Sequence, residues 1–294
     1  MFNILPKVKG KYYFNFDISR ISFMRVGGTC DILYIPQDIN DLIYFLQNKP
    51  ENLPIYVIGN LSNTIVTDKG IRGCCISLQN LNNVTLLNNI IVVECGITIS
   101  NFVKYCINNN ISCCEQLYAI PGTIGGAIVM NAGVPSFEIR DVIESITLIN
   151  INDCSSILTI DNSNMTYRNG NLPKNYIAVS CKLNTQSKNA NELRLTIKNI
   201  IQKRIKTQPI NTNTCGSTFK NPNGYKAWQL IKESGCCGLK IGGAVVSNKH
   251  CNFIINEGNA TSSDVINLIE LIQEKVRNKT GILLESEVKI FGEI

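Results

Sequence analysis

The 294-residue chain is long enough for two domains, and its 44% hydrophobic and 17% charged residues are typical of a globular protein. No apolar run approaches the ~20 residues of a membrane span, and we expect no signal peptide at the N-terminus. The formal charge of +6 is scattered along the sequence, which fits small acidic ligands and does not indicate nucleic-acid binding.

The first elements predicted along the chain are a strand, a helix and a second strand. Residues 21–36 predict a turn and a strand that ends at Pro36, and Asp38 can cap a short helix. An apolar strand follows at residues 55–59, which completes a βαβ pattern. The loop that leaves this strand is rich in Gly, Asn and Ser. It is either a ligand-binding loop or a plain connection.

The middle of the chain predicts two more strands within residues 72–96 and a helix that begins at Thr98 or Ser100. This helix has one buried side, made of Ile99, Phe102, Val103 and Cys106. Strands of a second sheet are expected at residues 142–150, 155–160 and 175–183.

The last third predicts two long helices. The first runs from residue 190 to Pro209, and the second from about Ser262 to Lys279 with Gly281 as its stop signal. The segment 282–292 alternates like a strand. It should place Ser286, Val288 and Ile290 on one face and Glu285, Glu287 and Lys289 on the other.

The thirteen cysteines do not form a metal or disulfide pattern. Six of them are adjacent pairs, and no C-x-x-C occurs. We therefore expect reduced thiols that pack as small core side chains, and no metal site.

Residues 119–133, AIPGTIGGAIVMNAG, are the most glycine-rich stretch. Such a backbone either turns sharply inside the core or offers N–H groups to an anion such as a diphosphate. Its G-x-x-G-G spacing matches neither the Rossmann fingerprint nor the P-loop. Both interpretations stay open from these residues alone.

Eight segments follow one another along the chain: FMRVGG (23–28), VIGNLSNTIV (57–66), AIPGTIGGAIVMNAG (119–133), TYR (166–168), QP (208–209), GSTFKNP (216–222), GGAVVSNKHCNFIIN (242–256) and LESEVKIFG (284–292). In this order they closely resemble UDP-N-acetylenolpyruvoylglucosamine reductases, the flavoenzymes that complete UDP-N-acetylmuramate for peptidoglycan and so serve cell wall biogenesis, cell shape and cell division.

The resemblance implies an α+β fold, in which a vanillyl-alcohol-oxidase (PCMH-type) FAD-binding domain at 1–205 has subdomains at about 1–75 and 76–205. A smaller α+β substrate domain at 206–294 would follow, as in the compact form of the family.

The same resemblance implies which residues hold FAD. The loop after the strand at 55–59 and the glycine-rich stretch would each direct N–H groups at the diphosphate. Arg25 is a looser match, and Leu61 stands where many relatives have glycine, so we expect a slightly different backbone at that turn. The implied cofactor-binding residues are Arg25, Gly59, Asn60, Ser62, Asn63, Pro121, Gly122, Thr123, Gly125, Gly126, Ala127, Asn131, Ala132 and Gly133.

Three residues match the family's catalytic positions. Ser217 would donate a proton, while Arg168 and Glu287 would flank the enolpyruvyl group. A fixed guanidinium suits the negative charge that develops there. Sequence alone also allows Ser217 to cap a turn and Glu287 to be a solvated strand residue. Tyr167, Lys220 and Asn221 are the implied substrate contacts.

We expect FAD as cofactor and NADPH as hydride donor, with NADPH and the UDP-sugar using one cleft in turn. The expected protein is a cytoplasmic monomer that binds neither nucleic acid nor membrane. Two alternatives remain: another oxidoreductase of the same flavin fold, or a non-catalytic flavin- or sugar-nucleotide-binding protein.

Overall fold

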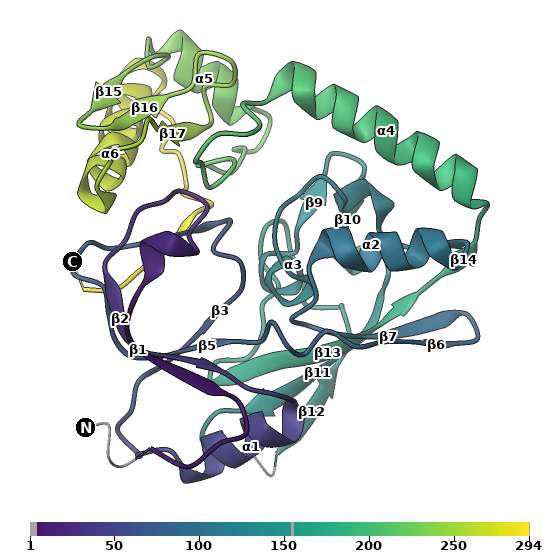
Figure 1. The fold of residues 1–294 in the computed structure, drawn as a ribbon. Helices are drawn as coiled ribbons and strands as arrows, with labels where there is room; N and C mark the ends of the chain where they lie inside the picture. Colours follow the sequence, from purple (N-terminus) through teal and green to yellow (C-terminus); the bar gives the residue numbers. More distant parts are fainter. Residues whose placement is uncertain (1–4, 154–155, 294) are drawn as a thin grey trace. The chain divides into compact units, whose positions relative to one another are not determined.

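The computed structural model of the protein describes residues 5–153 and 156–293 as a mixture of helices and strands (Figure 1). It contains two compact units. The first consists of the chain up to Phe14, Ile32–Asn60 and Gly73–Gln202, and the second of Asn15–Asp31, Leu61–Arg72 and the chain from Lys203 onward. The second unit thus includes two N-terminal segments that the sequence interpretation assigned to the first domain. The predicted domain division itself stays a prediction.

The helices are α1 (Ile39–Asn48), α2 (Ile99–Asn108), α3 (Ile124–Met130), α4 (Ala190–Thr207), α5 (Ala227–Glu233) and α6 (Ser262–Thr280), with short 3-10 helices η2 (Ile18–Arg20), η3 (Glu115–Leu117) and η4 (Ile139–Asp141). The strands are β1 (Lys11–Asp17), β2 (Thr29–Ile35), β3 (Ile55–Ile58), β4 (Thr64–Val66), β5 (Ile71–Ser77), β6 (Val84–Leu87), β7 (Ile90–Glu94), β8 (Ile111–Ser112), β9 (Gly133–Val134), β10 (Phe137–Glu138), β11 (Ile143–Asn150), β12 (Ile157–Ile160), β13 (Tyr176–Asn184), β14 (Gln186–Ser187), β15 (Lys240–Ile241), β16 (Ala244–Val246), β17 (Ile254–Asn256) and β18 (Lys289–Phe291).

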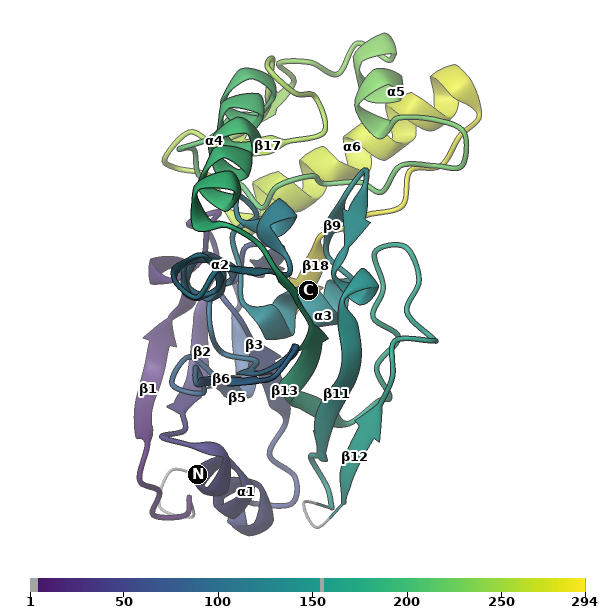
Figure 2. The same ribbon diagram turned by 90° about the vertical axis from the view of Figure 1, so that its right-hand side faces the viewer.

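A five-stranded antiparallel sheet forms the centre of the first unit. Its strand order is β12-β11-β13-β7-β6, and Figure 2 shows β12, β11 and β13 side by side. Phe102 of α2 and Ile124 of α3 belong to the same buried core as Ile146 of β11. The predicted strands at 142–150 and 175–183 are confirmed. The one predicted at 155–160 begins outside the described residues and continues as β12.

A four-stranded sheet has the order β1-β2-β5-β3, with β3 and β5 parallel. The predicted strand, helix and strand are confirmed as β2, α1 and β3, although β5 lies between the two strands in the sheet. Asp38 caps α1 as expected, because its carboxylate accepts a hydrogen bond of 2.8 Å from the N–H of Asp41.

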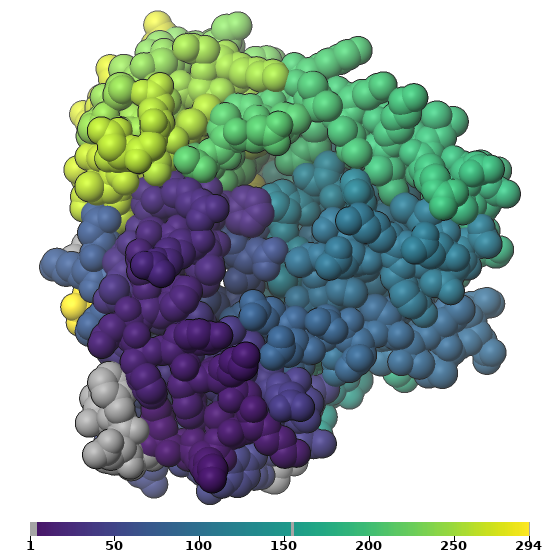
Figure 3. All heavy atoms as spheres, viewed as in Figure 1, coloured from purple at the N-terminus to yellow at the C-terminus, as the bar shows by residue number. Residues whose placement is uncertain are grey.

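The longer helices agree with the sequence patterns. Thr98 caps α2, and all four residues predicted for its buried side are buried. Helix α6 ends at Gly281, whose φ of 74° is the left-handed conformation that glycine favours. Helix α4 differs from these because only Leu193 and Ile197 are buried, so most of its side chains lie on the surface (Figure 3).

The second unit has its own core, which includes Leu230 of α5, Ala244 of β16 and Ile269 of α6. Strands β15, β16 and β17 form an antiparallel sheet, and β18 pairs in parallel with β4. The Asp68 carboxylate accepts hydrogen bonds from the N–H groups of Ser262 and Ser263, the first residues of α6. A negative charge at a helix N-terminus is stabilising.

Several features differ from the sequence-based expectations. The glycine-rich stretch contains helix α3, because burial of Ile124 and Ile128 outweighs the poor helix propensity of its glycines. Helix α5, strands β1 and β6, and the sheet of β15, β16 and β17 were not predicted, and the final strand is limited to Lys289–Phe291. Ahead of that strand, the backbone of residues 285–287 bonds to residues 218–220 instead of continuing the ladder.

The expectation that all cysteines are reduced is wrong at two positions. Cys237 and Cys251 form a disulfide, and their Cα atoms are 5.5 Å apart. The fold brings together two residues 14 apart in sequence, a contact that spacing alone did not reveal. The other cysteines in the described ranges are buried thiols.

Within the described residues, no helix is both long enough and apolar enough to span a membrane. The same part of the chain contains no group of three or more His, Cys, Asp or Glu residues placed to hold a metal ion.

Asp41 is a buried carboxylate that joins α1 to the segment before β1. Its two oxygens accept hydrogen bonds from the N–H groups of Lys9, Gly10 and Gln37 and from the Tyr34 hydroxyl. Burial alone would raise the pKa of Asp41, but these hydrogen bonds hold it below its usual value. The ionised form therefore stabilises the fold.

We expect Asp41→Asn to lower the free energy of unfolding by about 2–4 kcal/mol at pH 7, because the amide cannot accept from all these donors. A carboxyl with a lowered folded pKa contributes its full stabilisation above the unfolded pKa of about 4, and that contribution is lost as the pH falls through the folded value. Urea unfolding from pH 2 to 8 should therefore show the difference from the wild type shrinking below pH 4. Glu51→Gln, at an exposed carboxylate, is the control. A difference that stays constant down to pH 2 would contradict this account.

Candidate active site

The loop that follows β3 offers backbone donors. Within the described chain, the N–H groups of Gly59, Asn60 and Leu61 have no hydrogen-bond partner. Leu61 has a φ of 51° and is buried, so this residue adopts the left-handed conformation in which glycine would be unstrained. The turn therefore keeps a glycine-like backbone despite its leucine. Successive N–H groups next to a left-handed residue form an anion-binding concavity.

The start of α3 provides fewer donors than its glycines suggested. The N–H groups of Ile124, Gly125 and Gly126 already donate to Ile97 O, Cys95 O and Thr123 Oγ1. Those of Gly122 and Thr123 have no partner among the described residues. A Cβ added to Gly59 would lie 2.9 Å from Thr123 Oγ1, so the loop after β3 lies against the start of α3.

The remaining predicted cofactor residues have other contacts. Ala127 and Asn131 are buried, and the N–H of Ala132 donates to Ala127 O. Asn63 Nδ2 donates to the Glu287 carbonyl. Arg25 is exposed, has a φ of 58°, and donates to the carbonyl of Arg20. The structure thus gives Ala127, Asn131, Ala132 and Arg25 structural contacts.

Arg168 lies at the tip of a tight turn in the first unit. Thr166 and Asn169 exchange backbone hydrogen bonds of 2.9 and 3.0 Å across the turn, and Arg168 has a φ of 55°. The Arg168 guanidinium donates to Gly133 O at 2.9 Å and lies 4.9 Å from the centre of the exposed Tyr167 ring. A left-handed arginine is strained by about 1 kcal/mol or more. The surrounding contacts must therefore hold it in place.

Ser217 and Glu287 lie on neighbouring backbone segments of the second unit. The N–H of Glu287 donates to Thr218 O at 2.8 Å, and that of Lys220 donates to Glu285 O at 2.9 Å. These bonds place the segment that carries the Ser217 hydroxyl next to the segment that carries the Glu287 carboxylate. Main-chain pairing therefore brings together the two segments that carry Ser217 and Glu287.

The Ser217 hydroxyl makes no hydrogen bond within the described residues, although its side chain is half-buried. It caps no turn, since the next helix, α5, has Lys226 at its N-cap. The alternative structural role is therefore not observed. Gly216, just before it, has a φ of 78°, a conformation that would strain any other residue.

Asn252 holds the Ser217 segment and was not predicted from the sequence. It is buried, and its side-chain amide both accepts from the N–H of Phe219 (3.0 Å) and donates to Phe219 O (2.8 Å). The main-chain carbonyl of Asn252 accepts a hydrogen bond from the N–H of Thr218 at 2.8 Å, and its main-chain N–H donates to His250 Nδ1. The sequence signal was its position inside the GGAVVSNKHCNFIIN segment.

His250 is the single histidine of the chain. Burial lowers its pKa, and its Nδ1 is the acceptor for Asn252, so the neutral imidazole fits this environment. Its ring lies edge-on to Phe253 at 4.8 Å. These contacts give His250 a structural role.

The predicted substrate residues of the second unit differ in their contacts. Lys220 Nζ forms an ion pair of 2.6 Å with Glu285. Asn221 is exposed, and its Oδ1 accepts from the N–H of Ala227 at the start of α5. Both residues lie on the loop that continues from Ser217.

We expect Asn252→Ala to lower the free energy of unfolding by about 2–4 kcal/mol, because the N–H and C=O of Phe219 lose their partner in a buried setting. Amide hydrogen exchange at Phe219 should accelerate at the same time. Asn248→Ala, at an exposed asparagine four residues earlier, is the matched control and should change neither quantity. Unchanged exchange at Phe219 in the Asn252 variant would refute the positioning role.

Comparisons with known proteins cover nearly the whole chain. Residues 208–291 match a family model described as UDP-N-acetylenolpyruvoylglucosamine reductase, C-terminal domain, and residues 30–157 match one described as FAD binding domain. The chain is 42% identical to the UDP-N-acetylenolpyruvoylglucosamine reductase of Orientia tsutsugamushi (strain Ikeda), covering 98% of this chain and 97% of that protein. It is 39% identical to the protein of the same name from Rickettsia akari (strain Hartford), over 98% of each chain.

Among solved structures, this chain is similar to the UDP-N-acetylenolpyruvylglucosamine reductase from Thermus caldophilus, with a TM-score of 0.80 and 26% identity. The similarity covers 97% of this chain and all of that one. The predicted α+β fold, with a PCMH-type FAD-binding domain and a further C-terminal domain, is confirmed.

Proposed function

Because the chain belongs to the family of UDP-N-acetylenolpyruvoylglucosamine reductases, we propose that Arg168, Ser217 and Glu287 carry the reduction of an enolpyruvyl group in this protein. The protein is a flavin-dependent oxidoreductase that uses NADPH to convert UDP-N-acetylglucosamine enolpyruvate to UDP-N-acetylmuramate in peptidoglycan synthesis. The observation that supports the residue roles most directly is the unpartnered Ser217 hydroxyl on the segment paired with that of Glu287.

The residues present fit FAD. The unpartnered N–H groups of Gly59 and Asn60 and those of Gly122 and Thr123 lie on two segments in contact with each other, and donors of this kind bind a diphosphate. When bound there, FAD would supply the redox chemistry, which is the relay of a hydride from NADPH to the substrate. The protein contributes binding, orientation and control of the proton.

The reduction adds a hydride to the terminal alkene carbon and a proton to the neighbouring carbon, so NADPH supplies both electrons. Negative charge develops on the neighbouring carbon and its carboxylate. Arg168 stabilises that charge, since its guanidinium is planar, permanently charged and able to bind a carboxylate with two hydrogen bonds. Ser217 donates the proton from its hydroxyl to the carbon.

Glu287 orients the same enolpyruvyl group. Its backbone is fixed from two sides, by Thr218 O and by Asn63 Nδ2. A carboxylate next to a developing dianion is unfavourable unless it is protonated or paired, so its role requires one of these states. Tyr167, Lys220 and Asn221 contact the UDP-sugar, and Ser62, Asn63, Pro121, Gly125, Gly126 and Gly133 line the FAD site.

NADPH and the UDP-sugar bind in turn, which accounts for a single substrate domain. The protein acts as a monomer in the cytoplasm and binds neither membrane nor nucleic acid. Of the two alternatives, another enzyme of the flavin fold is disfavoured by the match of residues 208–291 to the reductase C-terminal domain. A non-catalytic binding protein would not require Arg168, Ser217 and Glu287 together.

The purified protein should be yellow, with a flavin absorbance spectrum that NADPH bleaches and the enolpyruvyl substrate restores. The reason is that the oxidised flavin is both the chromophore and the hydride acceptor. Absorbance spectra before and after each addition provide the measurement. A colourless protein that cannot be reconstituted with FAD would disprove the proposed function.

Ser217→Ala should leave flavin reduction by NADPH unchanged and slow reoxidation by the enolpyruvyl substrate by roughly 10²–10⁴-fold, the usual contribution of a general acid. Stopped-flow measurement of the two half-reactions separates these effects. Ser263→Ala, a serine that binds the Asp68 carboxylate, serves as the control and should reoxidise normally. Near-normal turnover of the Ser217 variant would remove this residue from its role.

A further inference from the structure

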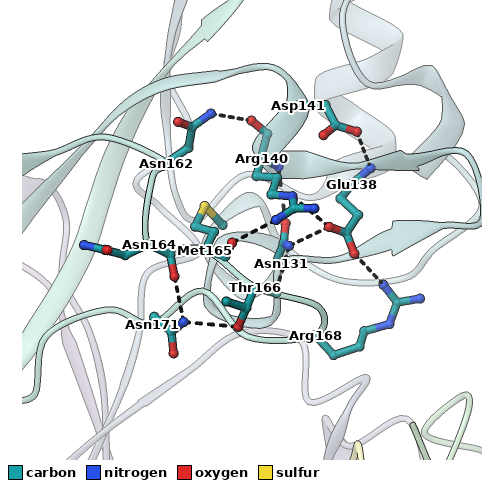
Figure 4. A network of polar contacts seen from close by, with 10 residues as sticks. All are labelled: Asn131, Glu138, Arg140, Asp141, Asn162, Asn164, Met165, Thr166, Arg168 and Asn171. Atoms are coloured by element: carbon teal, nitrogen blue, oxygen red, sulfur yellow. Dashed lines mark hydrogen bonds and ion pairs between the residues drawn. The ribbon is translucent and has the colours of Figure 1, made fainter. Parts of the chain in front are cut away.

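The hairpin formed by β9 and β10 holds the Arg168 guanidinium. Gly133 of β9 and Glu138 of β10 are cross-strand partners in this hairpin. Gly133 O accepts from Arg168 Nη2 at 2.9 Å, and Glu138 Oε1 lies 3.8 Å from Arg168 Nη1. Two neighbouring groups of one hairpin, a carbonyl and a carboxylate, therefore fix the direction of one guanidinium. Figure 4 shows the contact between Glu138 and Arg168.

The Glu138 carboxylate is itself fixed by two further contacts. Its Oε2 accepts from Asn131 Nδ2 at 2.9 Å and pairs with Arg140 Nε at 2.9 Å. The side chains of Glu138 and Arg168 are 15% and 17% exposed, so the pair is shielded from solvent and is more than a surface ion pair. One oxygen is thus held by Asn131 and Arg140, and the other lies next to Arg168.

The same network holds the backbone that carries Arg168. Asn131 Nδ2 also donates to Thr166 O at 2.9 Å, and Arg140 Nη1 donates to Met165 O at 2.9 Å. Asn171 Nδ2 donates to Thr166 Oγ1 at 3.1 Å. Because Glu138 binds both Asn131 and Arg140, the carboxylate connects the guanidinium of Arg168 to the supports of its own loop (Figure 4).

We propose that Glu138 is the positioning residue for Arg168: it sets the direction of the guanidinium that stabilises the charge developing on the enolpyruvyl group. This inference rests on the proposed role of Arg168. The arrangement also has an electrostatic consequence. Two guanidinium groups share the Glu138 carboxylate, so this carboxylate alone does not cancel both positive charges. A second carboxylate, that of Asp141, belongs to the same network through the N–H of Glu138.

The Arg168 guanidinium must attract an anion and must also stay in one orientation, and the contact with Glu138 serves the second requirement. The contact from Glu138 adds to the hydrogen bond to Gly133 O and to the contact with the Tyr167 ring, and so further restricts the orientation of the guanidinium. Positioning errors of about 1 Å can reduce a rate by about 100-fold. The expected effect of losing Glu138 is therefore on the rate of the step in which Arg168 acts, rather than on flavin binding.

The test is Glu138→Gln, which keeps the shape of the side chain and removes its charge. Stopped-flow measurement should show an unchanged rate of flavin reduction by NADPH and a reoxidation by the enolpyruvyl substrate that is roughly 10- to 100-fold slower. The flavin content should stay near wild type, because Asn131 still binds Thr166 and Arg140 still binds Met165. The melting temperature should fall only in part, because Arg168 loses the compensation of its charge but its loop keeps these supports. Equal losses in both half-reactions, or none in reoxidation, would overturn the inference.

Glu144→Gln is the matched control. Glu144 is a half-buried glutamate on β11, six residues from Glu138, and its carboxylate makes no hydrogen bond or ion pair within the described residues. Its substitution removes the same charge, so both half-reactions should proceed at wild-type rates. If Glu144→Gln slows reoxidation as much as Glu138→Gln does, the effect is one of net charge and the positioning role is refuted.

Combination with Arg168→Ala separates this inference from the proposed function. If Glu138 acts through Arg168, adding Glu138→Gln to Arg168→Ala should slow reoxidation no further. A multiplied loss in the double variant would overturn the inference. Normal reoxidation in Arg168→Ala alone would instead overturn the proposed role of Arg168.

Glu138→Asp keeps the charge but withdraws it by one methylene group, and it covers the case in which Glu138→Gln does not fold. Its reoxidation should be slowed with flavin reduction intact. Wild-type reoxidation in this shortened variant would count against the positioning role.

Discussion

Buried asparagine side chains hold the loops that carry the proposed catalytic residues Arg168 and Ser217. Asn131 and Asn252 are buried, and each bonds to the main chain of a segment distant in sequence. A loop backbone cannot satisfy its own polar groups as a helix or a sheet does, and unpaired buried groups are costly. An amide has both a donor and an acceptor, so one side chain can pair with an N–H and a C=O together. The loops that carry Arg168 and Ser217 are fixed in this way.

The two supports differ in their electrostatics because the groups they position differ. Asn252 holds a neutral hydroxyl-bearing segment, and its four polar groups all bond to the main chain or to His250. Arg168 is charged and partly shielded from solvent, so an amide alone would leave its charge without compensation. Glu138 supplies that compensation. The charged Arg168 in the first unit therefore needs the Glu138 carboxylate, whereas the neutral segment of Ser217 in the second unit needs only the Asn252 amide.

The sequence predicted the elements that depend on local patterns. Asp38 and Thr98 cap α1 and α2 as expected, since a capping side chain and its N–H target lie within three residues. The sequence did not predict the hydrogen bonds of Asn252 or the disulfide between Cys237 and Cys251. Those contacts join residues that are 14 to 33 positions apart, and a local hydrophobic pattern does not indicate which distant segments come into contact. Ser217 and Glu287 emerged only through the order of family motifs, because a serine after glycine and a glutamate in an alternating segment are individually ordinary.

The glycine-rich stretch shows why residue type alone left two interpretations open. Gly122 keeps an unpartnered N–H, as an anion-binding loop requires. Gly125 has a different reason to be glycine, because a Cβ there would lie 3.0 Å from the Cys95 carbonyl oxygen. Gly133 lies against the backbone of Phe137 and offers its carbonyl to Arg168. The stretch is thus neither a single cradle nor a single buried turn. Under the proposed function its glycines serve ligand binding, close packing and the placement of the Arg168 charge, and only the tertiary contacts distinguish them.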